Sequence, residues 1–224
     1  MERHQRPHQR YQKGAVMKAF AQHRGVALPL MTENINTDVI IPSREMKRVS
    51  KAGLANGLFA NIRYKDGKRQ PDSDFLLNQP AYSTASILLL GCNAGCGSSR
   101  EHAVWALRDY GFRVIIAESF ASIFFDNCVA NSILPVILNR DILIHISDWV
   151  RSDPKVNLVD VNLAQCQVTI EGATFPFEIG ALARRMLKDG LSPIDLTLEY
   201  RDNIEAFAKE DAQKRPWLYD TNFH

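Results

Sequence analysis

The chain has 224 residues, of which 46% are hydrophobic and 23% charged, and its 27 Lys and Arg nearly balance its 25 Asp and Glu, for a net charge of +2. This composition excludes a disordered, collagen-like or coiled-coil chain, and the length suffices for a hydrophobic core without disulfide bonds. The small net charge gives no sign of a nucleic-acid-binding surface. The longest purely aliphatic runs, such as 87–90, are much shorter than the roughly 18 residues of a membrane-spanning helix.

The N-terminal segment, residues 1–16, differs from the rest of the chain. It is polar, contains four Lys and Arg against one Glu, and lacks the apolar stretch of a secretory signal peptide. We therefore predict a disordered basic extension over 1–16, with Met17 as an alternative start, and a single domain over 17–224. The four cysteines do not resemble the dense disulfide framework of a small secreted protein, so we expect a reduced, cytoplasmic protein.

The first part of the predicted domain contains short elements. Val26–Leu30 and Asp38–Ile41 are rich in β-prone residues, and Pro42 ends the second of these runs. Ser43 is a favourable helix cap, so we expect a short helix to begin within 43–51.

The region 86–138 contains the clearest pattern. A buried strand is predicted at Ile87–Leu90, and a glycine-rich loop leads from it into a helix over Arg100–Tyr110 that Gly111 ends. A strand, a helix and a further strand are then predicted at 112–117, 119–127 and 135–138. A strand, a glycine-rich turn, a helix and a strand together are typical of a βαβ unit, which predicts a parallel sheet and an α/β fold.

The remaining residues continue this alternation of helices and strands. We predict helices at 142–150, 179–189 and 200–213, a strand at 159–163 and a hairpin over 168–177. The chain shows no internal repeat and no obvious linker, which favours one compact domain.

The glycine-rich loop contains the residues that are best suited to binding or catalysis. Gly95 and Gly97 permit backbone angles that other residues avoid, and Ser98 and Ser99 come where the helix begins, so that one of them can cap it. Arg100 adds a positive charge and a planar set of donors to the positive end of the helix dipole. Such a site suits a carboxylate or a phosphate, and its potential makes a serine a candidate general base or nucleophile. A turn that merely caps the helix is the alternative.

Three common functions do not fit this loop. It lacks the lysine of a Walker A loop, which argues against nucleoside-triphosphate binding. It also lacks the G-x-S-x-G pattern of α/β-hydrolases and does not match the G-x-G-x-x-G pattern of dinucleotide-binding folds.

At these residues the chain resembles a known family. The sequence Gly-Cys-Gly-Ser-Ser-Arg-Glu-His at 95–102, continuing as Ala-Val-Trp-Ala-Leu, is similar to the small subunits of 3-isopropylmalate dehydratase (isopropylmalate isomerase), in the aconitase superfamily. Asn34–Pro42 is similar to that family's N-x-(N/D)-T-D-x-I-I-P segment, and Asp109–Phe112, Ser119–Ala121 and Leu134–Val136 follow in the expected order. The similarity covers about residues 18–215.

The resemblance implies a swivelling β/β/α domain with a partly parallel sheet, like the aconitase C-terminal domain. It also implies a hydro-lyase of leucine biosynthesis that is active only as a heterodimer with a large subunit. That subunit would hold a [4Fe–4S] cluster on its own cysteines, while this chain would bind no cofactor. The reaction would dehydrate 2-isopropylmalate to 2-isopropylmaleate and rehydrate it to 3-isopropylmalate.

The resemblance also implies residue roles. Ser98 matches the serine that removes a proton from the carbon beside a carboxylate, Arg100 matches the arginine that binds a substrate carboxylate, and Ser99 is expected to be a supporting donor. Arg44 lies where many members have a basic residue facing the substrate, and Lys47 lies in the stretch that helps to select the variable group. For Arg44 and Lys47, a solvated surface position is the alternative reading.

The sequence departs from the family at 92–94, where Cys-Asn-Ala stands in place of Glu-Asn-Phe or a close variant. This departure and Lys47 leave open a related aconitase-superfamily subunit acting on another 2-hydroxy di- or tricarboxylic acid. A non-catalytic anion-binding module is a further alternative. Because no His or Cys pair has a recognised zinc spacing, we expect no metal site in this chain, and we expect no nucleic-acid or membrane partner.

Overall fold

The computed structural model describes residues 17–46, 52–65 and 69–219. Residues 17–190 form one compact unit, and 191–219 belong to a second one. The predicted extension over 1–16 lies outside the described residues. The prediction of a single domain over 17–224 stays a prediction.

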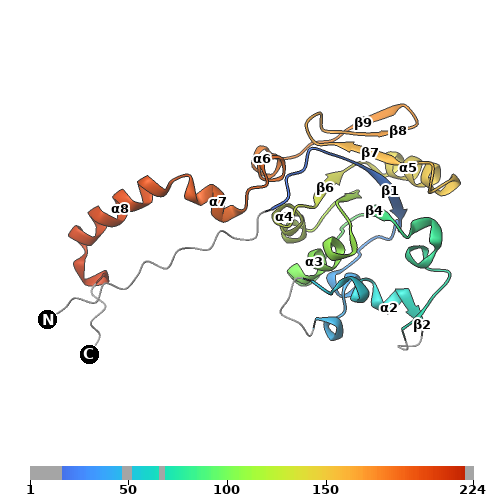
Figure 1. The fold of residues 1–224 in the computed structure, drawn as a ribbon, viewed down its shortest axis with the longest axis horizontal. Helices are drawn as coiled ribbons and strands as arrows, with labels where there is room; N and C mark the ends of the chain where they lie inside the picture. Colours follow the sequence, from blue (N-terminus) through green and yellow to red (C-terminus); the bar gives the residue numbers. More distant parts are fainter. Residues whose placement is uncertain (1–16, 47–51, 66–68, 220–224) are drawn as a thin grey trace. The chain divides into compact units, whose positions relative to one another are not determined.

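A mixed seven-stranded sheet forms the framework of residues 17–190 (Figure 1), in the order β6-β5-β4-β1-β7-β8-β9. Neighbours among β6, β5, β4 and β1 pair in parallel, whereas β7, β8 and β9 extend the sheet from β1 by antiparallel pairing. The strands are β1 (Gln22–Pro29), β4 (Ala85–Leu90), β5 (Val114–Ala117), β6 (Leu134–Ile137), β7 (Val159–Asn162), β8 (Gln167–Ile170) and β9 (Ala173–Pro176). The expected α/β fold with a partly parallel sheet is therefore confirmed. A separate two-stranded sheet joins β2 (Tyr64–Lys65) and β3 (Gln70–Pro71).

The helices of this unit connect and cover the strands. They are α1 (Thr37–Ile40), α2 (Ala60–Arg63), α3 (Glu101–Tyr110), α4 (Ser122–Ala130), α5 (Arg140–Ser152) and α6 (Ala181–Asp189), with short 3-10 turns η1 (Ser43–Glu45), η2 (Ala55–Gly57), η3 (Leu76–Asn78) and η4 (Pro80–Tyr82). Two of them, α3 and α4, connect successive parallel strands and contact each other, and α5 packs against β1. The helices predicted at 100–110, 119–127, 142–150 and 179–189 are thus confirmed, with shifts of up to three residues at their ends.

Burial explains the different sequence patterns of the strands. Ile87, Leu88, Leu89 and Leu90 of β4 are all fully buried, because β4 lies between β1 and β5 and helices cover the faces of a parallel sheet. In β7 and β8 buried residues alternate with partly exposed ones, as in a sheet with one solvated face. The predicted strand at 159–163 and hairpin over 168–177 are confirmed.

Two early predictions are wrong. Asp38–Ile41 is not a strand, because the Asn36 side chain accepts the Val39 N–H at 2.8 Å and caps helix α1 there. This local hydrogen bond outweighs the β preference of the Val and Ile residues. Ser43 is not a helix cap: it is the first residue of the 3-10 turn η1, and only 43–45 of the expected helix is helical among the described residues.

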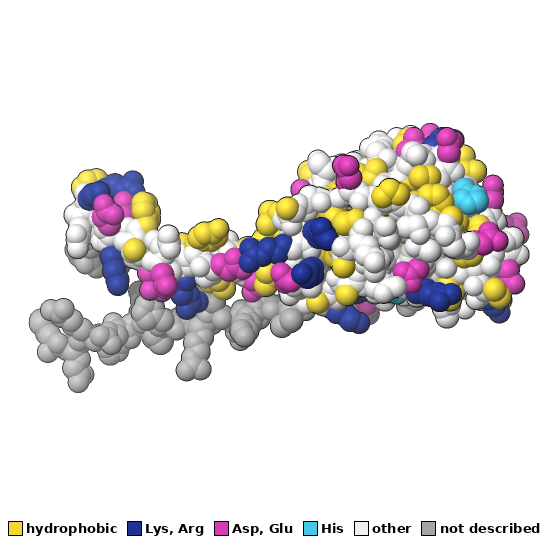
Figure 2. Space-filling view, turned by 90° about the horizontal axis from the view of Figure 1, so that it is seen from above, with side chains coloured by type: hydrophobic (Ala, Val, Ile, Leu, Met, Phe, Trp, Pro, Cys, Tyr) yellow, Lys and Arg dark blue, Asp and Glu magenta, His cyan; other side chains and the backbone are white. Residues whose placement is uncertain are grey.

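The segment 191–219 contains α7 (Pro193–Leu198), α8 (Arg201–Lys214) and the 3-10 turn η5 (Pro216–Leu218). The helix predicted at 200–213 is confirmed, and α7 was not predicted. Near the end of α8, Asp211 accepts hydrogen bonds from Tyr219 Oη at 2.8 Å and Arg215 Nε at 2.7 Å, which lower the pKa of the Asp211 carboxyl. Several large hydrophobic side chains of this segment are exposed, including Phe207 and Trp217. Figure 2 shows hydrophobic side chains on the surface of this segment.

Candidate functional site

The glycine-rich loop leaves β4 at the edge of the sheet where the parallel strands β1, β4 and β5 all end. On one side it pairs with the chain that follows β1. The Gly95 N–H donates to the Ile35 carbonyl at 2.7 Å, and the Thr37 N–H donates to the Cys96 carbonyl at 3.1 Å. The loop is therefore joined directly to the start of α1.

On its other side the loop is held by the chain that follows β5. The Ala94 N–H donates to the Ser119 carbonyl at 2.9 Å, and the Ala121 N–H donates to the Ala94 carbonyl at 3.0 Å. The Ser119 hydroxyl also accepts the Asn93 N–H at 2.8 Å. Hydrogen bonds from both flanking segments thus fix the backbone that precedes the turn after residue 95.

Glycine is needed at two points of this loop. Gly95 has φ +73°, and a Cβ built on it would overlap the ring of Phe124 in α4. Gly97 has φ +89°, again in the left-handed region that favours glycine. The two glycines let the loop pass close to α4 and then turn into α3.

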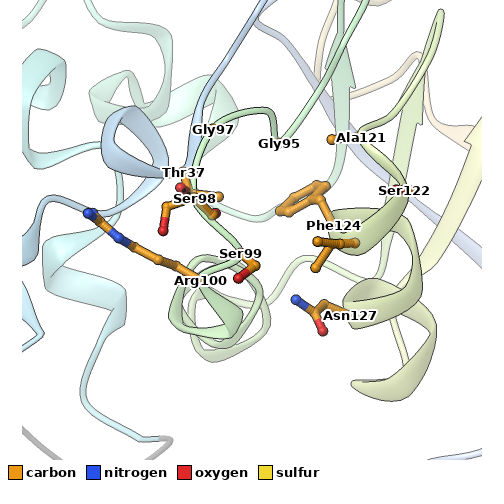
Figure 3. Close-up of a pocket in the computed structure, with 11 residues that line it drawn as sticks. Thr37, Gly95, Gly97, Ser98, Ser99, Arg100, Ala121, Ser122, Phe124 and Asn127 are labelled. Atoms are coloured by element: carbon orange, nitrogen blue, oxygen red, sulfur yellow. Dashed lines mark hydrogen bonds between the residues drawn. The ribbon is translucent and has the colours of Figure 1, made fainter.

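A cavity of about 80 Å³ lies between this turn and the first turns of α4. Figure 3 shows Ser98 and Arg100 on the side of Thr37, and Ser99 on the side of Asn127 from α4. Both serines are exposed and Arg100 is half-buried. Their hydroxyl and guanidinium groups can therefore be reached by a small acid.

The backbone and side chains of α1 fix Ser98 and Arg100. The Ser98 carbonyl accepts hydrogen bonds from the Thr37 hydroxyl at 3.0 Å and from the Arg100 N–H at 2.7 Å. The Arg100 guanidinium forms an ion pair with the Asp38 carboxylate. A hydroxyl and a cation are thus presented on one rigid turn.

The predicted role of a serine as helix cap is wrong. The N-cap of α3 is Arg100, with an extended backbone and no side-chain capping hydrogen bond, because the helix begins only at Glu101. Both serines lie before this cap, so capping does not occupy their hydroxyls.

Two helices begin at the cavity, and their positive ends add to the charge of Arg100. The N-cap of α4 is Ala121, which also makes no side-chain capping hydrogen bond. Glu101 Oε1 accepts hydrogen bonds from Trp105 Nε1 at 3.0 Å and from Asn131 Nδ2 at 2.9 Å, which connects the first turn of α3 to the end of α4. Two helix N-termini and the Arg100 guanidinium, which is paired with Asp38, are groups that favour an anion such as a carboxylate.

The structure brings together three of the five residues singled out in the sequence, namely Ser98, Ser99 and Arg100. Arg44 is exposed on η1, pairs with Glu45 at 3.6 Å and does not line this cavity. Lys47 lies outside the described residues.

Sequence reasoning assigned no role to three further residues at this site, Thr37, Asp38 and Asn127. The first two are the Thr-Asp of the segment Asn34–Pro42. The similarity of this segment to a family motif was the available sequence signal. For Asn127 the only sequence signal was its spacing of three residues from Phe124 on the helix that became α4.

Metal ligands do not converge in the part of the chain that the structure describes. No group of three or more His, Cys, Asp or Glu side chains there is arranged to hold a metal ion. The thiol of Cys128 is fully buried, which raises its pKa and disfavours the thiolate that metals bind. These residues do not fit an iron–sulfur cluster. Within the same described ranges, no helix is both long and apolar enough to span a membrane.

Comparisons with known proteins agree on one family. Residues 17–141 match the family described as Aconitase C-terminal domain. The chain is 52% identical to the 3-isopropylmalate dehydratase small subunit of Cupriavidus necator, over 91% of this chain and 99% of the relative. It is 44% identical to the protein of the same name from Azorhizobium caulinodans, over 90% of this chain and 100% of the relative.

A solved structure shows the same relationship. The crystal structure of 3-isopropylmalate dehydratase from Methanocaldococcus jannaschii is similar to this chain with a TM-score of 0.59 and 26% sequence identity. The similarity covers 84% of this chain and 99% of that one. The fold expected from the resemblance is therefore confirmed.

Proposed function

The chain belongs to the family of 3-isopropylmalate dehydratase small subunits, and on this premise we propose that its turn at 97–100 supplies the base and a carboxylate-binding group of the reaction. The chain is the small subunit of this hydro-lyase of leucine biosynthesis. The observation that carries the proposal is the presence of the exposed Ser98 hydroxyl and the Arg100 guanidinium on one turn, at the start of a helix.

Ser98 is the base in this proposal. A proton beside a carboxylate is only weakly acidic, so the group that removes it must be strongly basic at the moment of transfer. The positive ends of α3 and α4 and the charge of Arg100 stabilise the alkoxide form of Ser98 compared with a serine alkoxide in water. The hydrogen bond from Thr37 to the Ser98 carbonyl, at 3.0 Å, keeps the residue in place during the transfer.

Arg100 binds a substrate carboxylate with its planar pair of donors. Before the substrate arrives, Asp38 holds the guanidinium beside the cavity through their ion pair. Ser99 lies on the side of Asn127, and we assign it as a supporting hydrogen-bond donor to the substrate. We assign Arg44, on the turn that follows α1, to a position facing the substrate, and Lys47 to the stretch that helps to select the variable group of the substrate.

A large subunit completes the enzyme in this proposal. The relatives are named small subunits, which supports a larger partner chain. We assign the [4Fe–4S] cluster to that partner, since the described residues of this chain do not converge as a ligand set. The chemistry derived for this chain is therefore limited to binding the carboxylate and moving the proton.

The test is reconstitution. The chain is mixed with its large subunit, the cluster is rebuilt without oxygen, and the absorbance of 2-isopropylmaleate is followed from 2-isopropylmalate. We expect turnover from the mixture and none from either chain alone. Turnover only with a different 2-hydroxy acid would identify that acid as the substrate. No turnover with any such acid would favour a non-catalytic anion-binding module.

A further inference from the structure

The last turn of α3 contains an acidic residue, Asp109, in a position that opposes the helix dipole. It belongs to the Asp-Tyr-Gly-Phe motif at 109–112, which has no role in the proton transfer described above. A residue that breaks a local preference requires a compensating interaction.

Asp109 has two such interactions, both with a distant part of the chain. Its Oδ2 atom accepts the N–H of Gly53 at 2.9 Å and the N–H of Ala55 at 2.8 Å. The adjacent Tyr110 adds a third contact, because the Arg63 guanidinium lies 5.4 Å from the centre of its ring and donates to the Ala55 carbonyl at 3.3 Å. The end of α3 thereby fixes the segment 53–55.

This segment supports the turn that carries Arg44. A Cβ built on Gly57 would lie 2.7 Å from the Cβ of Glu45, so η1 packs directly on the backbone at Gly57. Arg69 Nη2 holds the same turn by donating to Glu45 Oε2 at 2.5 Å. A loss of order at 53–57 would therefore be transmitted to η1.

The segment is also joined to α1, which carries Asp38. The Phe59 N–H donates to the Ile40 carbonyl, the last residue of α1, at 2.7 Å. Helix α3 thus connects two regions of the chain: Ser98 to Arg100 precede its first turn, and its last turn fixes the segment on which η1 packs.

We propose that Asp109 is a positioning residue for substrate binding: by fixing 53–57 it holds the turn that carries Arg44, the residue proposed to face the substrate. This inference rests on the proposed function of Arg44. Asp109 does not touch the substrate and takes no part in proton removal, so it acts on binding and not on turnover.

The test compares Asp109→Ala with Asp109→Asn in the enzyme assembled with its large subunit. Alanine removes the acceptor of both N–H groups, and we expect the KM for 2-isopropylmalate to rise about fivefold while kcat stays within a factor of about two. Asparagine retains an oxygen that can accept the same N–H groups, so it restores the KM to near the wild-type value. The control is Asp189→Ala, an exposed aspartate in the last turn of α6, which leaves both constants unchanged.

A second measurement does not depend on activity. Hydrogen–deuterium exchange of the full chain follows the amides of Gly53 and Ala55, which we expect to exchange about tenfold faster in Asp109→Ala and at the wild-type rate in Asp189→Ala. If Asp109→Ala does not fold, Asp109→Glu, which displaces the carboxylate by one methylene group, replaces it, and a smaller rise in KM is expected.

Unchanged exchange at 53–55 would overturn the proposal, and so would a fall in kcat with an unchanged KM. Faster exchange without any change in KM would also overturn it, because the segment would then have no effect on binding. The proposed function fails on a different observation, full turnover without the Ser98 hydroxyl, so the two failures are distinguishable.

Discussion

The two halves of the main sheet differ in what their ends carry. In the parallel half, the chains that follow β1, β4 and β5 meet at one edge and hold the turn with Ser98 and Arg100 between them. In the antiparallel half, β8 and β9 are joined by a tight turn at 171–172, and strand ends alternate in direction. The candidate site therefore lies where parallel strands end, and none of the residues that line its cavity lies on β7 to β9.

The largest expected effect that tests this difference is at Gly95. Gly95→Ala introduces a Cβ at φ +73° into the space of the Phe124 ring. Strain and overpacking together predict a loss of about 3 kcal/mol in the free energy of unfolding, together with a strong loss of turnover. Chemical denaturation measures the first and the reconstituted assay the second. An unchanged denaturation midpoint would show that the loop can move away from α4 at little cost.

A smaller effect is expected from Arg100→Lys, which separates binding from folding in the parallel half. Lysine keeps the charge but lacks the planar pair of donors, so the KM is expected to rise by about 30-fold, equivalent to about 2 kcal/mol. The free energy of unfolding should stay nearly constant because Arg100 is half-buried beside an exposed partner, Asp38. Steady-state kinetics over a range of substrate concentrations checks this, and an unchanged KM would remove Arg100 from the binding site.

The mildest of these changes, Val161→Ala, tests the antiparallel half. Val161 is fully buried in β7, between His23 of β1 and Val168 of β8. Removal of two methyl groups is expected to lower the free energy of unfolding by roughly 1.5 kcal/mol and to leave kcat and KM unchanged. Denaturation and kinetics of the same preparation test both parts. A change in kcat would contradict the separation of this half from the candidate site.

Much of the parallel half could be predicted from sequence, because its signals are local. The aliphatic run of β4, the i, i+3, i+4 spacing in α3 and the glycines at 95 and 97 each indicate one conformation without reference to distant residues. The family motifs then predicted the candidate site at the same loop.

The features that were missed depend on neighbours far away in sequence. Asp38 acquires its place at the candidate site from an ion pair with Arg100, 62 residues later. The contacts of Asp109 with Gly53 and Ala55 span 56 and 54 residues. No periodicity in the sequence reports such pairs, so only the folded chain reveals them.

The central claim is that the Ser98 hydroxyl removes the proton, and its most direct test compares Ser98→Ala with Ser99→Ala in the reconstituted enzyme at saturating 2-isopropylmalate. Both variants should bind the large subunit and unfold like the wild type, since neither serine caps α3. We expect kcat to fall by about a thousandfold for Ser98→Ala and by about tenfold or less for Ser99→Ala. A kcat for Ser98→Ala within a few-fold of the wild-type value would contradict the account.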